Sequence, residues 1–399
     1  MLGEYKRKRT MKKSFITTFI LALLALTATA QPMEQREQSD ACITSADTQQ
    51  RKIASQIRAE VSETVELMSI LARTAGNREY NMDMAGQYTK DTEAWFAPYK
   101  QHAAVTCFQS LHNQYGISYD AVMSMAIHLD IDGGRIKFIG EQADLEKRWK
   151  DIDIENFIDK LNAFYTDTRF HDFFEQHRTF YDEGLKAYET NVMTYFHQDW
   201  YASFYGTAPT DRFRIVIGFT CGGGNYGSSR QLPGQPREAY AICGYYINPQ
   251  TGKPYGEGAN MAATLIHEFN HSFVNPLLNN EANASLIATT GQKLHKFSAY
   301  AMERQAYTNW QTVVNESIVR AAVILYMLDQ GFDQKQVLNE LANQVCCSFN
   351  WMPELVTSLR YYAAHRDQYP TLNDYYPEIA RCLSKFFENE VERMQKTLK

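Results

Sequence analysis

Residues 261–276 (MAATLIHEFNHSFVNP) place two histidines and a glutamate at a spacing that suits metal chemistry. On a helix, His267 and His271 lie one turn apart on the same face, so both imidazoles can reach one metal ion. Glu268 then lies beside the open coordination position, where a carboxylate can act as general base. This HExxH pattern is typical of zinc-dependent hydrolases.

The residues around the pattern predict an amphipathic helix with one buried side and one side facing a cleft. The polar arc holds Thr264, His267, Glu268, His271 and Asn275, and the opposite arc holds Ala262, Leu265, Ile266, Phe269 and Phe273. Pro276 disfavours helical geometry in the residue before it, so the helix is expected to end there. The alternative is a pair of surface histidines flanking a glutamate on an ordinary helix.

A catalytic zinc ion takes three protein ligands and keeps one position for water, so a third ligand must come from elsewhere. Between residues 272 and 328 the candidates are Glu281, Glu303, Glu316 and His295. The extended pattern HExxHxxGxxH fails, because Val274 and Leu277 stand where glycine and histidine are required. The metzincin class is therefore excluded.

Glu316 is the preferred third ligand because it lies in a segment, 309–328, that is apolar on nearly every side. A buried carboxylate must be paired or metal-bound, since desolvating it alone costs several kcal/mol. Arg320, four residues later, is the other visible partner. The alternative is a Glu316–Arg320 pair without a metal, and Glu303 is the reserve ligand.

Two predicted strands, 212–220 and 239–247, precede the histidine helix and enclose a glycine-rich stretch. Strands in this position resemble those of zincin proteases, where an edge strand holds an extended peptide substrate. Gly222, Gly223, Gly224 and Asn225 are therefore candidates for a substrate-binding loop, and a flexible hairpin loop is the alternative. Cys221 and Cys243 are the first candidates for a disulfide.

The motif HEFNHSFVNP, followed later in the chain by NESIVRA, resembles the gluzincin group of zinc metallopeptidases. Within that group it resembles the exported proteins of domain-of-unknown-function family 4932, over about residues 212–330. The resemblance implies a mainly α, α+β fold with a zincin-like core: a small antiparallel sheet, an active-site helix and a glutamate helix. One departure is Arg320, because thermolysin-like enzymes carry an aspartate four residues after the ligand glutamate.

These features predict a metallopeptidase with one Zn²⁺ held by His267, His271 and Glu316, and with Glu268 as general base. Tyr300, Tyr307, His295 and Arg320 are candidates for oxyanion or substrate contacts. A catalytically silent zincin-fold binding protein and a zinc hydrolase of a non-peptide amide are the alternatives. The expected partner is a peptide or protein substrate.

The chain is expected to comprise a signal peptide (1–30), a polar tether (31–50), a helical layer (51–205), the catalytic core (206–332) and C-terminal helices (333–399). Helices are predicted over 52–74, 91–115, 145–165, 170–201, 334–344, 353–365 and 377–396. The signal peptide predicts an exported protein, either periplasmic or secreted, which has no membrane span once the signal is removed. Removing residues 1–30 subtracts six basic and one acidic residue from 40 and 46, which leaves a net charge of −11. That charge argues against nucleic-acid binding.

Overall fold

The computed structural model describes residues 57–398, apart from 83–84, 210, 248–257 and 306. The predicted signal peptide and polar tether lie outside the described residues. The chain from Ile57 onward forms one compact unit. Among its described helices, none combines the length and apolar character that crossing a membrane requires.

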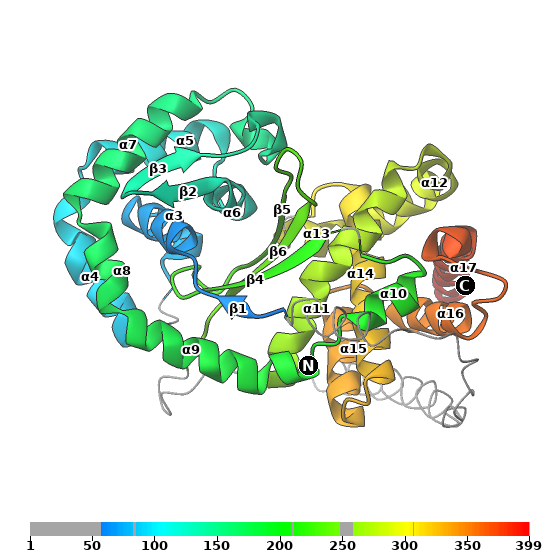
Figure 1. The fold of residues 1–399 in the computed structure, drawn as a ribbon. Helices are drawn as coiled ribbons and strands as arrows, with labels where there is room; N and C mark the ends of the chain where they lie inside the picture. The colour runs from blue at the N-terminus through cyan, green and yellow to red at the C-terminus, as the bar shows by residue number, and fades with distance from the viewer. Residues whose placement is uncertain (1–56, 83–84, 210, 248–257, 306, 399) are drawn as a thin grey trace, which may run out of the picture. The chain divides into compact units, whose positions relative to one another are not determined.

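Helices dominate the first half of the described chain (Figure 1). They are α3 (Glu63–Thr74), α4 (Gln87–Phe96), α5 (Ala103–Tyr115), α6 (Asp120–Ile127), α7 (Ile154–Asp167), α8 (Phe170–Gln176), α9 (Arg178–Asn191) and α10 (Asp199–Tyr205). Four of the predicted helix extents were wrong. The segment 91–115 is divided between α4 and α5, and the helix predicted from residue 145 starts only at Ile154. The first helix starts only at Glu63, where Ser62 caps it, and 170–201 is divided among three helices. A hairpin of β2 (Leu129–Asp132) and β3 (Arg135–Phe138), turning at two glycines with positive φ, was not predicted.

The central sheet has four strands in the order β1-β4-β6-β5. They are β1 (Ala59–Glu60), β4 (Arg212–Gly218), β5 (Asn225–Arg230) and β6 (Glu238–Gly244). β4 runs parallel to both β1 and β6, and only β5 is antiparallel to its neighbour. The expected antiparallel sheet is therefore wrong, and the sheet is mixed. The reason is β5 itself: the chain reverses there, so that β6 runs again in the direction of β4.

Helix α11 (Gly258–Val274) packs on one face of this sheet, against β5 and β6. Helices α3 and α6 contact β4 and β5 from the opposite face. The two predicted disulfide partners lie on these two sides. The Cys221 Sγ atom is 3.5 Å from Ser69 Oγ of α3, whereas Cys243 lines a cavity together with Met261 of α11. Both thiols are free, so the predicted disulfide is wrong.

The C-terminal half is helical. Its helices are α12 (Glu281–Phe297), α13 (Ala299–Arg304), α14 (Trp310–Asp329), α15 (Gln334–Cys346), α16 (Met352–Ala364) and α17 (Leu372–Thr397). Helix α14 lies among α11, α12, α15 and α16, which explains why it is apolar on nearly every side (Figure 1). The predicted mainly helical α+β class is confirmed.

Candidate metal centre

Helix α11 presents its two histidines from the face opposite its buried side. Leu265 and Phe269 are fully buried, and the Phe269 ring stacks on Phe213 of β4 with 4.2 Å between centroids. This packing fixes the rotation of the helix. The His267 and His271 side chains are 19% and 21% exposed, so they are accessible but sheltered.

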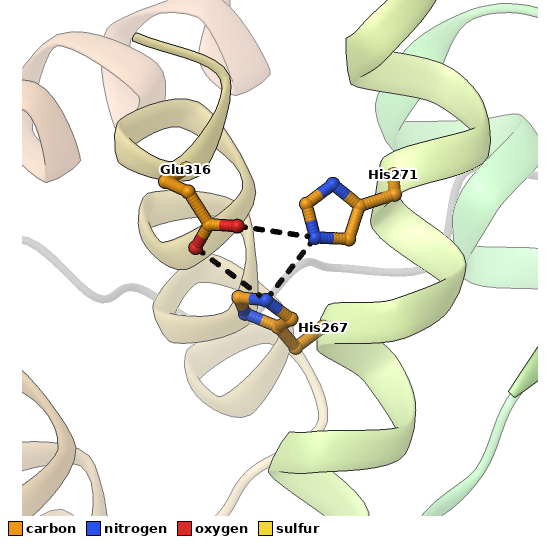
Figure 2. A group of neighbouring side chains, drawn as sticks. All are labelled: His267, His271 and Glu316. Carbon is orange, nitrogen blue, oxygen red and sulfur yellow. Dashed lines mark hydrogen bonds and ion pairs between the residues drawn. The ribbon is translucent and has the colours of Figure 1, made fainter. Parts of the chain in front are cut away.

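Helix α14 brings Glu316 to the histidines. The two helices pack together, and the Asn270 amide of α11 donates to the Val319 carbonyl of α14 at 3.3 Å. Glu316 is buried, with Oε2 3.6 Å from His267 Nε2 and Oε1 3.4 Å from His271 Nε2. Figure 2 shows the three side chains pointing toward one another from the two helices.

The distances within this group fit a single metal ion. The two histidine Nε2 atoms are 3.2 Å apart, and the three ligand atoms lie within 4.8 Å of one another. Two ligands bound tetrahedrally at about 2.1 Å are separated by about 3.4 Å, close to these spacings. Burial lowers the pKa of His267 to about 3, so its imidazole is neutral and has a lone pair to offer. Two imidazoles and a carboxylate form a donor set that zinc accepts.

Residues around the ligands fix their orientation. Asn275 Oδ1 lies 3.1 Å from His271 Nδ1, and an N–H on Nδ1 leaves Nε2 free for a metal. Arg320 Nε donates to Glu316 Oε2 at 2.9 Å. Burial alone would raise the pKa of the Glu316 carboxyl, but the positive charge that His267 and His271 carry when protonated, together with that of Arg320, holds that pKa below its usual value. The predicted Glu316–Arg320 pair therefore coexists with the histidine contacts.

Glu268 lies next to the ligand group and beneath strand β5. Burial raises the pKa of its carboxyl to about 7. The nearby backbone N–H of Gly227 in β5 favours the charged form of that carboxylate and so offsets part of the effect of burial on its pKa. A Cβ atom on Gly227 would lie only 2.8 Å from Glu268 Oε2, so glycine permits this close approach. β5 is one of the two outer strands of the sheet, and the candidate base lies against the face of this strand at Gly227.

Two cavities open along α11 near Glu268. The first, about 230 Å³, is mostly polar, and its lining includes Gly227, Ser228, Arg237, Glu268, His271 and Asn275. The second, about 310 Å³, lies beside the turn of α11 that precedes Glu268. Its lining includes Tyr188, Asn225, Cys243, Tyr246, Met261 and Thr264. Space for a ligand therefore adjoins Glu268 between α11 and the sheet.

The remaining predicted site residues fall at different distances from the group. The Tyr307 hydroxyl accepts from Arg320 at 2.8 Å, and His295 Nε2 lies 3.2 Å from the Tyr307 carbonyl. Tyr300 is 75% exposed and lies under Arg304. The reserve ligand Glu303 is exposed and outside the metal-binding group.

The glycine-rich stretch leads into β5 rather than forming a free loop. Gly222 and Gly223 have positive φ, and a Cβ on Gly222 would meet the Glu79 carbonyl oxygen at 2.0 Å. The Asn225 side chain accepts from the Gly244 N–H, which joins β5 to the end of β6. Sequence reasoning placed Gly227 in a stretch that lets the backbone approach a ligand, but did not place it against Glu268. Its only local signal was its place in a glycine-rich stretch close to the helix.

Comparison with known proteins connects most of the chain to one family. Residues 57–382 match the family described as Domain of unknown function (DUF4932). No curated protein and no solved structure matches the chain. The family match includes the sheet, α11 and α14, and so all the residues of the candidate metal centre. The chain belongs to the DUF4932 family.

Proposed function

We propose that this protein is an exported zinc-dependent peptidase of the gluzincin type, with a zincin-like core. One observation carries the proposal: two imidazoles of α11 and a carboxylate of α14 converge, and Glu268, outside that ligand set, lies beside them. A structural metal site needs no additional carboxylate beside its ligands. A hydrolytic site needs one to accept a proton from water.

His267, His271 and Glu316 would hold the ion. Zinc, when bound there, polarises the scissile carbonyl and acidifies water. Glu268 takes the proton of the attacking water and then passes it to the leaving amine nitrogen. Tyr307 is close enough to the ligand group to donate to the developing oxyanion through its hydroxyl.

The edge of β5 supports a peptide as the substrate. β5 pairs with β6 on one side only, and its Gly227 lies directly against Glu268. An extended peptide that pairs with such an edge presents its backbone carbonyls at regular intervals, whatever its side chains are. The polar cavity beside Glu268 and the apolar cavity beside Met261 and Thr264 offer room for substrate side chains.

Glu268→Gln tests the proposal. We expect the variant to keep its bound zinc, because Glu268 is not in the ligand group, and to lose peptide turnover by about 100- to 10,000-fold. Glu303→Gln is the matched control, since it neutralises an exposed carboxylate outside the metal-binding group. Zinc content by mass spectrometry and cleavage of a quenched peptide library provide the readouts. Wild-type turnover in Glu268→Gln would refute the role of Glu268.

The export part of the proposal rests on residues 1–30 of the sequence. The proposal predicts a mature protein that begins near Gln31. Mass spectrometry of the protein recovered from the periplasm or medium measures this directly. If the protein is found only inside the cell and still carries residues 1–30, export is excluded.

A further inference from the structure

Arg320 is held on all three of its nitrogen atoms. Nε donates to Glu316 Oε2 at 2.9 Å, Nη1 to Gln344 Oε1 at 2.7 Å, and Nη2 to the Tyr307 hydroxyl at 2.8 Å. Its guanidinium carbon also lies 4.8 Å from the centre of the Phe349 ring. The side chain is only 14% exposed. The guanidinium plane is therefore fixed from several directions.

The partners of Arg320 are themselves fixed by other elements. Gln344 lies on α15, and its amide donates to Glu340 one turn earlier, which defines which atom of the amide faces Arg320. Tyr307 precedes α14, and its carbonyl lies 3.2 Å from His295 of α12. Contacts from α12 and α15 thus converge through Arg320 on one oxygen of Glu316.

A planar guanidinium specifies direction as well as charge, because its N–H groups form a rigid fork. The Glu316 side chain has several rotatable bonds. Arg320 lies one helical turn further along α14. Without this contact the Glu316 carboxylate could turn away from His267 and His271. With it, Oε1 stays 3.4 Å from His271 Nε2 and Oε2 stays 3.6 Å from His267 Nε2.

We propose that Arg320 is the positioning residue of the metal centre, which orients the Glu316 carboxylate toward the two histidines through the Gln344 and Tyr307 contacts. The inference rests on the metal site of the proposed function. It does not require that the protein cleave peptides.

Two substitutions separate orientation from charge. Arg320→Lys keeps the positive charge but loses the fork, and Arg320→Met keeps only the apolar stem. We expect both variants to bind Zn²⁺ and Co²⁺ about 10- to 100-fold more weakly than the wild type. The visible absorption bands of bound Co²⁺ should change in both variants, because those bands report the ligand geometry. Chelator competition gives the affinities.

Arg230→Met is the matched control. Arg230 is also 14% exposed and pairs with a buried glutamate, Glu238, but it lies outside the metal-binding group. We expect this variant to lose stability and to keep wild-type metal affinity. If the Arg320 variants do not fold, Tyr307→Phe removes only the hydroxyl that holds Nη2. It should weaken metal binding by a smaller factor than Arg320→Met.

The results for the Arg320 variants and for the wild type distinguish failure of this inference from failure of the peptidase proposal. Wild-type affinity and Co²⁺ spectra in Arg320→Lys, with tighter binding in Arg320→Met, would mean that Arg320 acts through charge alone and would overturn the inference. Lower stability with unchanged metal affinity would overturn it as well. If both variants bind metal weakly and the wild type cleaves no peptide, Arg320 keeps this role and the peptidase proposal fails. A wild-type protein that binds no metal would overturn both.

Discussion

Replacing Gly227 with alanine tests whether strand β5 and Glu268 act as one unit. A Cβ at this position would lie 2.8 Å from Glu268 Oε2, whereas ordinary contacts begin at 3.4 Å. The carboxylate oxygen must therefore move by about 0.6 Å, away from the position in which the proposed mechanism has it accept a proton. A misplacement of about 1 Å in a catalytic group can cost about 100-fold in rate. We expect kcat to fall by about 10- to 100-fold.

The same substitution should leave the metal and the fold intact. Gly227 does not have a positive φ, so alanine fits the backbone of β5 without strain. The nearest other atoms, the Glu268 carbonyl oxygen and Cα, lie at 3.5 and 3.9 Å, which are ordinary contacts. Zinc content and the denaturant midpoint should therefore match those of the wild type.

Gly134→Ala provides the control. This glycine lies in the β2–β3 turn with φ +78°, and no atom lies within 4 Å of an added Cβ. We expect it to lose some stability through backbone strain and to keep full peptidase activity. The assay is steady-state hydrolysis of a fluorogenic peptide, with zinc measured on the same samples. Wild-type kcat in Gly227→Ala would refute the idea that β5 positions Glu268.

Three further results are expected. Phe269→Ala should destabilise the fold by about 3–5 kcal/mol in urea unfolding, because it removes a fully buried ring stacked on Phe213; a loss below 1 kcal/mol would contradict the packing that orients α11. Asn275→Ala should weaken zinc binding by about 10- to 100-fold in chelator competition, since it removes the partner of His271 Nδ1; unchanged affinity would show that this contact does not orient the histidine. Zinc at 100 times its Kd should stabilise the wild type by about 2.7 kcal/mol, and much less in Glu316→Ala, as followed by thermal unfolding; equal stabilisation in both would exclude Glu316 as a ligand.

Local spacing explains why part of the candidate centre was predictable. The distance between residues four apart on a helix is set by backbone hydrogen bonds, so His267 and His271 had to share a face. Glu316 was found by a different argument, because a lone acid in an apolar helix must have a partner after burial. The structure gives it two kinds of partner, the histidines and Arg320.

The sheet and the contacts around the ligands were not predictable in the same way. β5 (NYGSSR) has one side chain that favours strands, Tyr226, and no β-branched residue. Its strand signal is therefore weak, and its pairing with β6 stabilises it instead. Missing β5 led to the wrong strand direction. The disulfide prediction failed because the sequence does not show that the sheet lies between Cys221 and Cys243.

The sequence by itself determined the mainly helical class, the spacing of the two histidines on α11 and the need for a partner at Glu316. Each depends on periodicity or on the cost of burying a charge, and both can be read from neighbouring residues. Only the tertiary structure decided that Gly227 lies against Glu268 and that Arg320 holds Glu316 with Gln344 and Tyr307. These contacts join segments far apart in the chain, and their geometry depends on how whole helices and strands pack.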